Sequence, residues 1–186
     1  MRGAQLAGAN LLESVWGVVD CTDARATGVN FVKLDLSRTV WDGAHLASAN
    51  FIECTLSGAS FVRADLSAAN FVTCAAQGLR APGARLRAAT FVERTDISGC
   101  DLRSADCAQT NFGGMALRGA RFDHAQLGGA NLRLADLTDV HLTRVVAIGA
   151  LLSRARMVRV QARGANFMNA VLQNADLRSA DLTGSN

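Results

Sequence analysis

The chain has few of the residues from which most globular cores are built. Its 186 residues include eight Phe, two Trp, one Pro and no Tyr, and Lys33 is the only lysine. No stretch of 18 apolar residues occurs, which excludes a transmembrane helix. The N-terminus lacks the apolar segment of a signal peptide, and the five Cys show no C-x-x-C spacing. We therefore expect a cytoplasmic protein with reduced thiols.

A five-residue period runs through the whole chain. Apolar residues recur at every fifth position from Leu6 to Phe91 and, after a slip of one residue, from Ile97 to Leu182. All eight Phe and both Trp occupy these central positions. The residue two before each centre is small or apolar, most often Ala. None of the 19 Lys and Arg or the 16 Asp and Glu residues falls on either set. Helices and single strands do not have this period.

A square coil with five residues per side accounts for the pattern. The central residue and the residue two before it point inward, and the other three face water. Most Gly stand two residues after a centre, where a turn needs positive φ. Twenty residues close one coil, so we predict about nine coils in a single domain, 1–186. The slip, at 92–96, predicts a bulge near Arg94 or Thr95 in a continuous rod.

The repeats resemble those of a known family. The A-(D/N)-(L/F)-x-x motif of pentapeptide-repeat proteins is matched by Ala130-Asn131-Leu132, Ala135-Asp136-Leu137, Ala165-Asn166-Phe167, Ala175-Asp176-Leu177 and Ala180-Asp181-Leu182. The resemblance implies an all-β fold, a right-handed quadrilateral β-helix. It also implies one possible function, since some members protect DNA gyrase from quinolones or peptide toxins by mimicking DNA. Those members have a strongly acidic surface, whereas the net charge here is +3.

The sequence does not predict an enzyme. His45, His124 and His141 fall in different coils, and all five Cys take inward positions. A metal site needs three or four converging ligands, so we expect no metal, no cofactor and no catalytic residue. Nucleic-acid binding is not expected either, because no aromatic side chain points outward to stack on bases.

Outward positions supply the candidate binding surfaces. An apolar stripe is formed by Leu12, Val32, Ile52, Val72 and Val92. It reflects either a preference for β-branched residues in extended backbone or a contact surface for a partner. A candidate oligomer patch comprises Leu151, Met168 and Val171, and a candidate basic patch comprises Arg156, Arg159 and Arg178. A column of Asn, from Asn10 through Asn30 and Asn50, predicts an amide ladder.

These features favour a non-enzymatic scaffold that presents a rigid surface to a protein partner. One specific version is a module that works in secretion or toxin delivery. Gyrase protection is the alternative. No segment outside the repeats covers the apolar interior of the last coils, so we also expect a homo-oligomer formed through a helix end.

Overall fold

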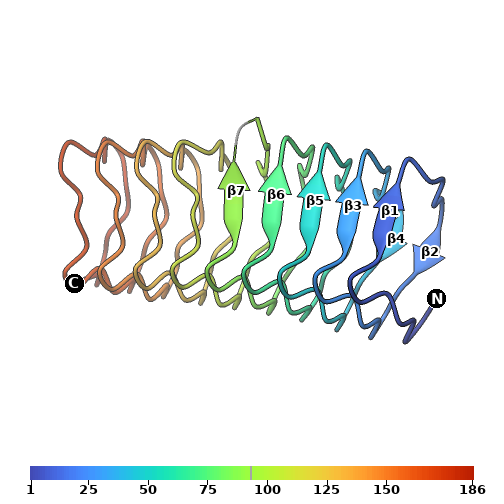
Figure 1. The fold of residues 1–186 in the computed structure, drawn as a ribbon. Coiled ribbons are helices and arrows are strands. Elements are labelled where there is room, and N and C mark those ends of the chain that lie inside the picture. The colour runs from blue at the N-terminus through green and yellow to red at the C-terminus, as the bar shows by residue number, and fades with distance from the viewer. Residues whose placement is uncertain (93) are drawn as a thin grey trace.

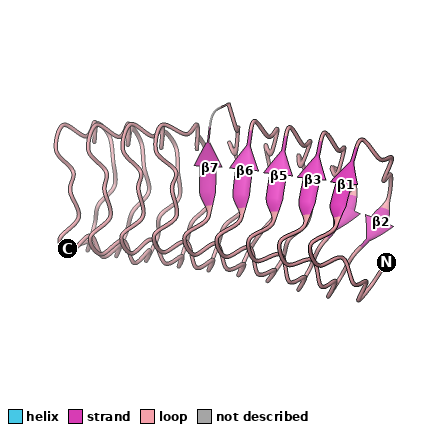
Figure 2. Cartoon of the chain, viewed as in Figure 1, coloured by secondary structure: helices cyan, strands magenta, loops and turns pink. Residues whose placement is uncertain are grey.

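The chain winds into a rod with its two termini at opposite ends (Figure 1). The computed structural model describes residues 1–92 and 94–186, so the predicted bulge lies partly outside the described residues. Within the described residues there is no α-helix, and hence no helix long and apolar enough to cross a membrane. Short strands alternate with turns, and loops make up most of the chain (Figure 2).

In residues 1–92 and 94–186, seven short strands form two parallel sheets. The larger sheet has the order β1-β3-β5-β6-β7, and the smaller pairs β2 with β4. The strands of the larger sheet are β1 (Asn10–Leu12), β3 (Asn30–Val32), β5 (Asn50–Ile52), β6 (Asn70–Val72) and β7 (Thr90–Val92). Those of the smaller are β2 (Val19–Asp20) and β4 (Thr39–Val40). Each strand thus pairs with a strand that lies one coil away.

Isolated parallel bridges extend this pairing along the rest of the rod. They join residues 20 apart, as in Arg25 with His45 near one end and Gln161 with Asp181 near the other. Backbone N–H groups donate to carbonyl oxygens of the next coil, for example Leu46 to Asp65 at 2.7 Å. The pairing confirms the all-β solenoid predicted from the five-residue period.

The interior of the rod is a column of aromatic and aliphatic side chains. Phe31, Phe51, Phe71 and Phe91 are at most 1% exposed, and their rings are stacked with centroids 4.9, 4.8 and 4.5 Å apart. Phe112 continues the stack beyond the slip at 5.2 Å. Rings stack here because side chains at equivalent positions of successive coils are one strand spacing apart. The inward assignment of the central residues is confirmed.

Corner turns explain the distribution of glycine. Gly83, which follows Pro82, has a φ of 67°, as a type II turn requires. The same left-handed conformation is adopted elsewhere by Arg63 and Asp139, with φ of 55° and 60°. Glycine is therefore favoured at this position but not required.

The one-residue slip changes the spacing of the bridges without ending them. Ala75 bridges Asp96, 21 residues on, whereas Asp101 and Arg121 are again 20 apart. Thr95 takes the inward position and is 4% exposed. Its hydroxyl accepts a hydrogen bond from the Cys74 N–H at 3.1 Å and donates to the Val92 carbonyl at 2.8 Å. The threonine thus satisfies buried backbone groups next to the extra residue.

The segment 14–18 departs from the regular coil. The period assigns Ser14 to an inward position, but it is exposed. Trp16 is only partly buried, and its indole N–H donates to the Ser14 hydroxyl at 2.9 Å. Val15 and Val18 are 99% and 81% exposed. This side of the first full coil therefore presents apolar side chains to the surface.

Candidate binding surfaces

The apolar stripe follows one edge of the larger sheet. Its members are the last residues of β1, β3, β5, β6 and β7, and each bridges the next in register. Leu12 is 59% exposed, and Val32, Ile52, Val72 and Val92 are partly buried. The structure thus brings all five predicted residues together as a continuous row along the rod.

An amide ladder runs beside the stripe. The side-chain amide of Asn30 donates to the Asn10 carbonyl oxygen at 2.6 Å, Asn50 donates to Asn30 at 2.7 Å, and Asn70 donates to Asn50 at 2.9 Å. The Thr90 hydroxyl ends this run by donating to Asn70 at 2.6 Å. The predicted ladder is confirmed. Because the amides bond one another, we assign them a structural role.

The apolar surface continues beyond the five residues predicted from the period. Val15 and Val18 follow Leu12 around the corner and are among the most exposed large apolar residues of the chain. The period alone could not find them, because it assigned this side to a regular coil. The available signal was the presence of Val at outward positions where the next coil has Asp35 and Arg38.

The residues of the candidate oligomer patch lie at the surface of neighbouring coils, and another exposed apolar residue adjoins them. Leu151 bridges Val171, which is 41% exposed, and Met168 is 50% exposed. Ile148, 36% exposed, belongs with them because it stands one coil from Met168. The 20-residue spacing would have identified it. That this patch joins two copies of the chain stays a prediction.

The basic patch is largely neutralised by carboxylates. The Arg178 guanidinium binds both oxygens of Asp176 at 2.8 and 2.7 Å, and Arg159 binds Asp139 at 2.7 and 2.6 Å. Arg156 lies in a bridge column next to Asp176. Arg159 and Arg178 are thus engaged by carboxylates, and the patch does not form an open anion site.

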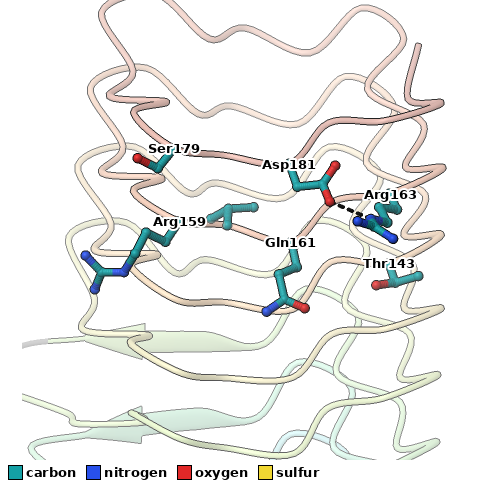
Figure 3. Close-up of a pocket in the computed structure, with 7 residues that line it drawn as sticks. Thr143, Arg159, Gln161, Arg163, Ser179 and Asp181 are labelled. Carbon is teal, nitrogen blue, oxygen red and sulfur yellow. Dashed lines mark hydrogen bonds and ion pairs between the residues drawn. The ribbon is translucent and has the colours of Figure 1, made fainter.

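A shallow recess of about 630 Å³ lies beside this patch (Figure 3). The Asp181 carboxylate pairs with Arg163 across it, while Gln161 and Thr143 lie nearby. Among the described residues, no group of three His, Cys, Asp or Glu could hold a metal ion. The recess lining contains no histidine or cysteine.

Two carboxylates near this end of the rod should make the stability of the fold sensitive to acid. Hydrogen bonds from the Arg178 guanidinium lower the pKa of Asp176 to about 2, and the Thr183 hydroxyl, with Arg163, does the same for Asp181. A carboxyl group whose pKa is lower in the folded state stabilises the fold above its ordinary pKa and loses that contribution as the pH falls. We expect the thermal midpoint to fall between pH 5 and about pH 2. Calorimetry would test this, and an Asp176→Asn/Asp181→Asn variant should show a smaller fall; an equal fall would contradict the prediction.

The cysteines belong to the core. All five are buried, and desolvation raises the pKa of Cys74 and of Cys100 to about 12. The Cys54 thiol donates to the Phe31 carbonyl at 3.4 Å. A buried thiol with a raised pKa is a poor nucleophile at neutral pH.

The coiled architecture defines a β-solenoid repeat protein whose candidate sites lie on its outer surface. A sequence profile of pentapeptide repeats matches eight copies, in residues 42–75, 95–133, 135–174 and 150–186. These segments cover more than half of the chain. The protein therefore belongs to the pentapeptide repeat family.

Solved structures of other pentapeptide repeat proteins are similar. QnrB1, a plasmid-mediated fluoroquinolone resistance protein, is 18% identical over 100% of this chain and 87% of that chain, with a TM-score of 0.58. HetL, a protein involved in heterocyst differentiation regulation from the cyanobacterium Nostoc sp. strain PCC 7120, is 24% identical over 98% and 89%, with a TM-score of 0.39. A protein from the Arabidopsis thaliana thylakoid lumen is 32% identical over 49% and 63%, with a TM-score of 0.48. No curated protein matches the chain.

Proposed function

We propose that the protein is a non-enzymatic scaffold that binds a protein partner through the apolar stripe. The observation that carries this proposal is the register of the stripe: five apolar residues at the ends of five paired strands form one continuous row. At its N-terminal end the exposed Leu12 belongs to this row, and Val15 and Val18 extend it with further exposed apolar side chains. Continuous apolar surface of this kind marks interaction sites more often than scattered apolar residues do.

The competing explanation for the stripe is that β-branched residues are preferred in extended backbone. Substituting threonine for the stripe residues distinguishes the two explanations. Threonine is β-branched and favours strands, but it is less apolar. A Val32→Thr/Ile52→Thr/Val72→Thr variant should therefore fold with little change in stability yet lose its partner. Persistence of binding in the folded variant would contradict the proposal.

Site-specific photo-cross-linking in cells is the direct measurement. A photoreactive amino acid at Val32 or Ile52 should yield a cross-linked protein species. The same amino acid at Arg63, which is exposed on another corner of the coil, serves as the matched control and should not. Equal yields from all three positions would show that the stripe has no special role.

A second candidate is protection of DNA gyrase. It is favoured by the match to QnrB1 over the full length of this chain, whereas DNA mimicry is disfavoured by the net charge of +3. The test is a supercoiling assay with purified gyrase and a fluoroquinolone. Restored supercoiling on addition of the protein would support this function, and unchanged inhibition would exclude it.

A further inference from the structure

The corner that carries the stripe also carries charges whose net sign differs between the two halves of the rod. This corner, which we call the stripe edge, comprises three columns that run along the whole rod, namely those that begin at Leu12, Glu13 and Val15, together with Arg94 at the slip. In its N-terminal half it exposes Glu13, Asp35 and Glu53, together with the cation Lys33. In its C-terminal half it exposes Arg94, Arg133, Arg154 and Arg156, and the partly buried Asp96 also lies there. The 20-residue spacing, 21 across the slip, places Glu13 and Arg154 in one column and Asp35 and Arg156 in another.

These nine charged residues differ from many other surface residues in forming no ion pair with a described residue. Nine ion pairs are formed within residues 1–92 and 94–186, and none involves a charged residue named above. Asp136 and Asp176 adjoin Arg156 in the bridge column, but they pair with Arg118 and Arg178. Among the charges that form no ion pair within the described residues, acids outnumber the one cation, Lys33, in the apolar half, and arginines outnumber the one acid, Asp96, in the other half. The edge therefore has a net acidic, apolar half and a net basic half.

We infer that the partner of the stripe is a second copy of this chain, bound edge to edge in antiparallel orientation. The inference rests on the proposed function and names its partner. Its basis is charge complementarity, because the surface that matches the acidic half of the edge is the basic half of the same edge. An isologous two-fold contact uses one surface twice and satisfies both halves at once. A parallel contact would bring like charges together.

The shape of the edge is compatible with such packing. Gly114 leaves open space beyond Val92, where the apolar half of the other copy would lie, whereas the side chains of Asn111 and Asn131 lie against Gly113. At about 4.8 Å per coil, the edge runs roughly 34 Å from Leu12 to Ser153. A strip about 15 Å wide would bury on the order of 1,000 Å² in total, near the lower limit for a specific interface. We therefore expect a dimer with micromolar affinity that weakens with salt.

Sedimentation of the full chain tests association. The dissociation constant should rise at least about tenfold between low and high salt, because screening weakens contacts between exposed charges.

Two charge-reversal variants, Glu13→Arg/Glu53→Arg and Arg133→Glu/Arg154→Glu, should each be monomeric. An equimolar mixture of the two should recover the dimer, since each half then meets an opposite charge. A matched control, Arg63→Glu/Arg144→Glu, reverses charge at equivalent turn positions on another corner and should leave the dimer intact.

The relative orientation of the two copies is tested by measuring the distance between spin labels attached to them. The native thiols are buried, so spin labels can be attached through Lys33→Cys in one copy and Ser153→Cys in the other. The mixed pair should lie closer than two labels both attached through Lys33→Cys. A larger distance for the mixed pair would overturn the antiparallel arrangement.

The outcomes separate this inference from the proposed function. A chain that stays monomeric but cross-links from the stripe to a different protein overturns the inference and leaves the scaffold standing. A dimer that survives both charge-reversal variants uses another surface and also overturns the inference. A monomer without stripe cross-links refutes both proposals.

Discussion

Replacing Phe71 with alanine should lower the free energy of unfolding by about 3–5 kcal/mol. The ring is fully buried and lies between those of Phe51 and Phe91, at 4.8 and 4.5 Å with interplanar angles of 3° on both sides. Truncation removes both stacking contacts and leaves a cavity. Because the backbone on each side is fixed by hydrogen bonds to neighbouring coils, the column cannot collapse to fill it. Urea denaturation gives the difference directly.

Two matched substitutions give the expected order of effects. Phe167→Ala makes the same chemical change at a central position that is only partly buried, so it should lower the free energy of unfolding by less than Phe71→Ala does. Asn70→Ala removes one rung of the amide ladder, with bonds at 2.9 and 2.6 Å, and should cost about 0.5–1.5 kcal/mol per hydrogen bond lost. If Asn70→Ala were the more damaging substitution, the inward and outward assignment would be wrong.

The fold was predictable because the five-residue period determines which side chains are buried. Phe71 could be assigned to a central position and Ala69 to the inward position two residues before it. Apolar or small residues recur at both positions along the chain, and no charged residue occupies either. The 20-residue spacing then places Asn50 beside Asn70, and Leu12 beside Val32. A repeat that contacts only its neighbours makes such inferences possible, because each coil repeats the same environment.

The state of the surface charges was harder to predict. Arg159 and Asp139 are 20 residues apart, so their ion pair could have been anticipated from the spacing. The bond between Arg178 and Asp176 depends on side-chain conformation, which the period does not specify. The period did not predict the irregular side near Ser14, because a repeat pattern describes the average coil. The only signal was local: Val15 and Val18 stand at outward positions where the next coil has charged residues.

Replacing Ala64 with aspartate should prevent stable folding near neutral pH. Ala64 is fully buried, as are Ala44 and Ala84 at the equivalent position of the adjacent coils. Its N–H donates to the Phe61 carbonyl at 3.0 Å, and its carbonyl accepts from the Arg85 N–H at 2.9 Å. A carboxylate introduced here would have only methyl groups above and below it. Burying an unpaired charge is among the few changes that cost more than about 4–5 kcal/mol.

The matched control is Ala68→Asp, the same substitution four residues further along. Ala68 is exposed and has a φ of 55°, a conformation that Asp23 and Asp139 adopt at the same turn position. The Ala68→Asp substitution should lower the free energy of unfolding by no more than about 0.5 kcal/mol. The two variants should also differ in pH dependence. A buried carboxyl group has a pKa above its ordinary value, so its protonated form favours folding and the stability of Ala64→Asp should rise as the pH is lowered from 7 to about 5. Circular dichroism during thermal unfolding measures both effects, and an Ala64→Asp variant as stable as Ala68→Asp at pH 7 would show that this position does not face the core.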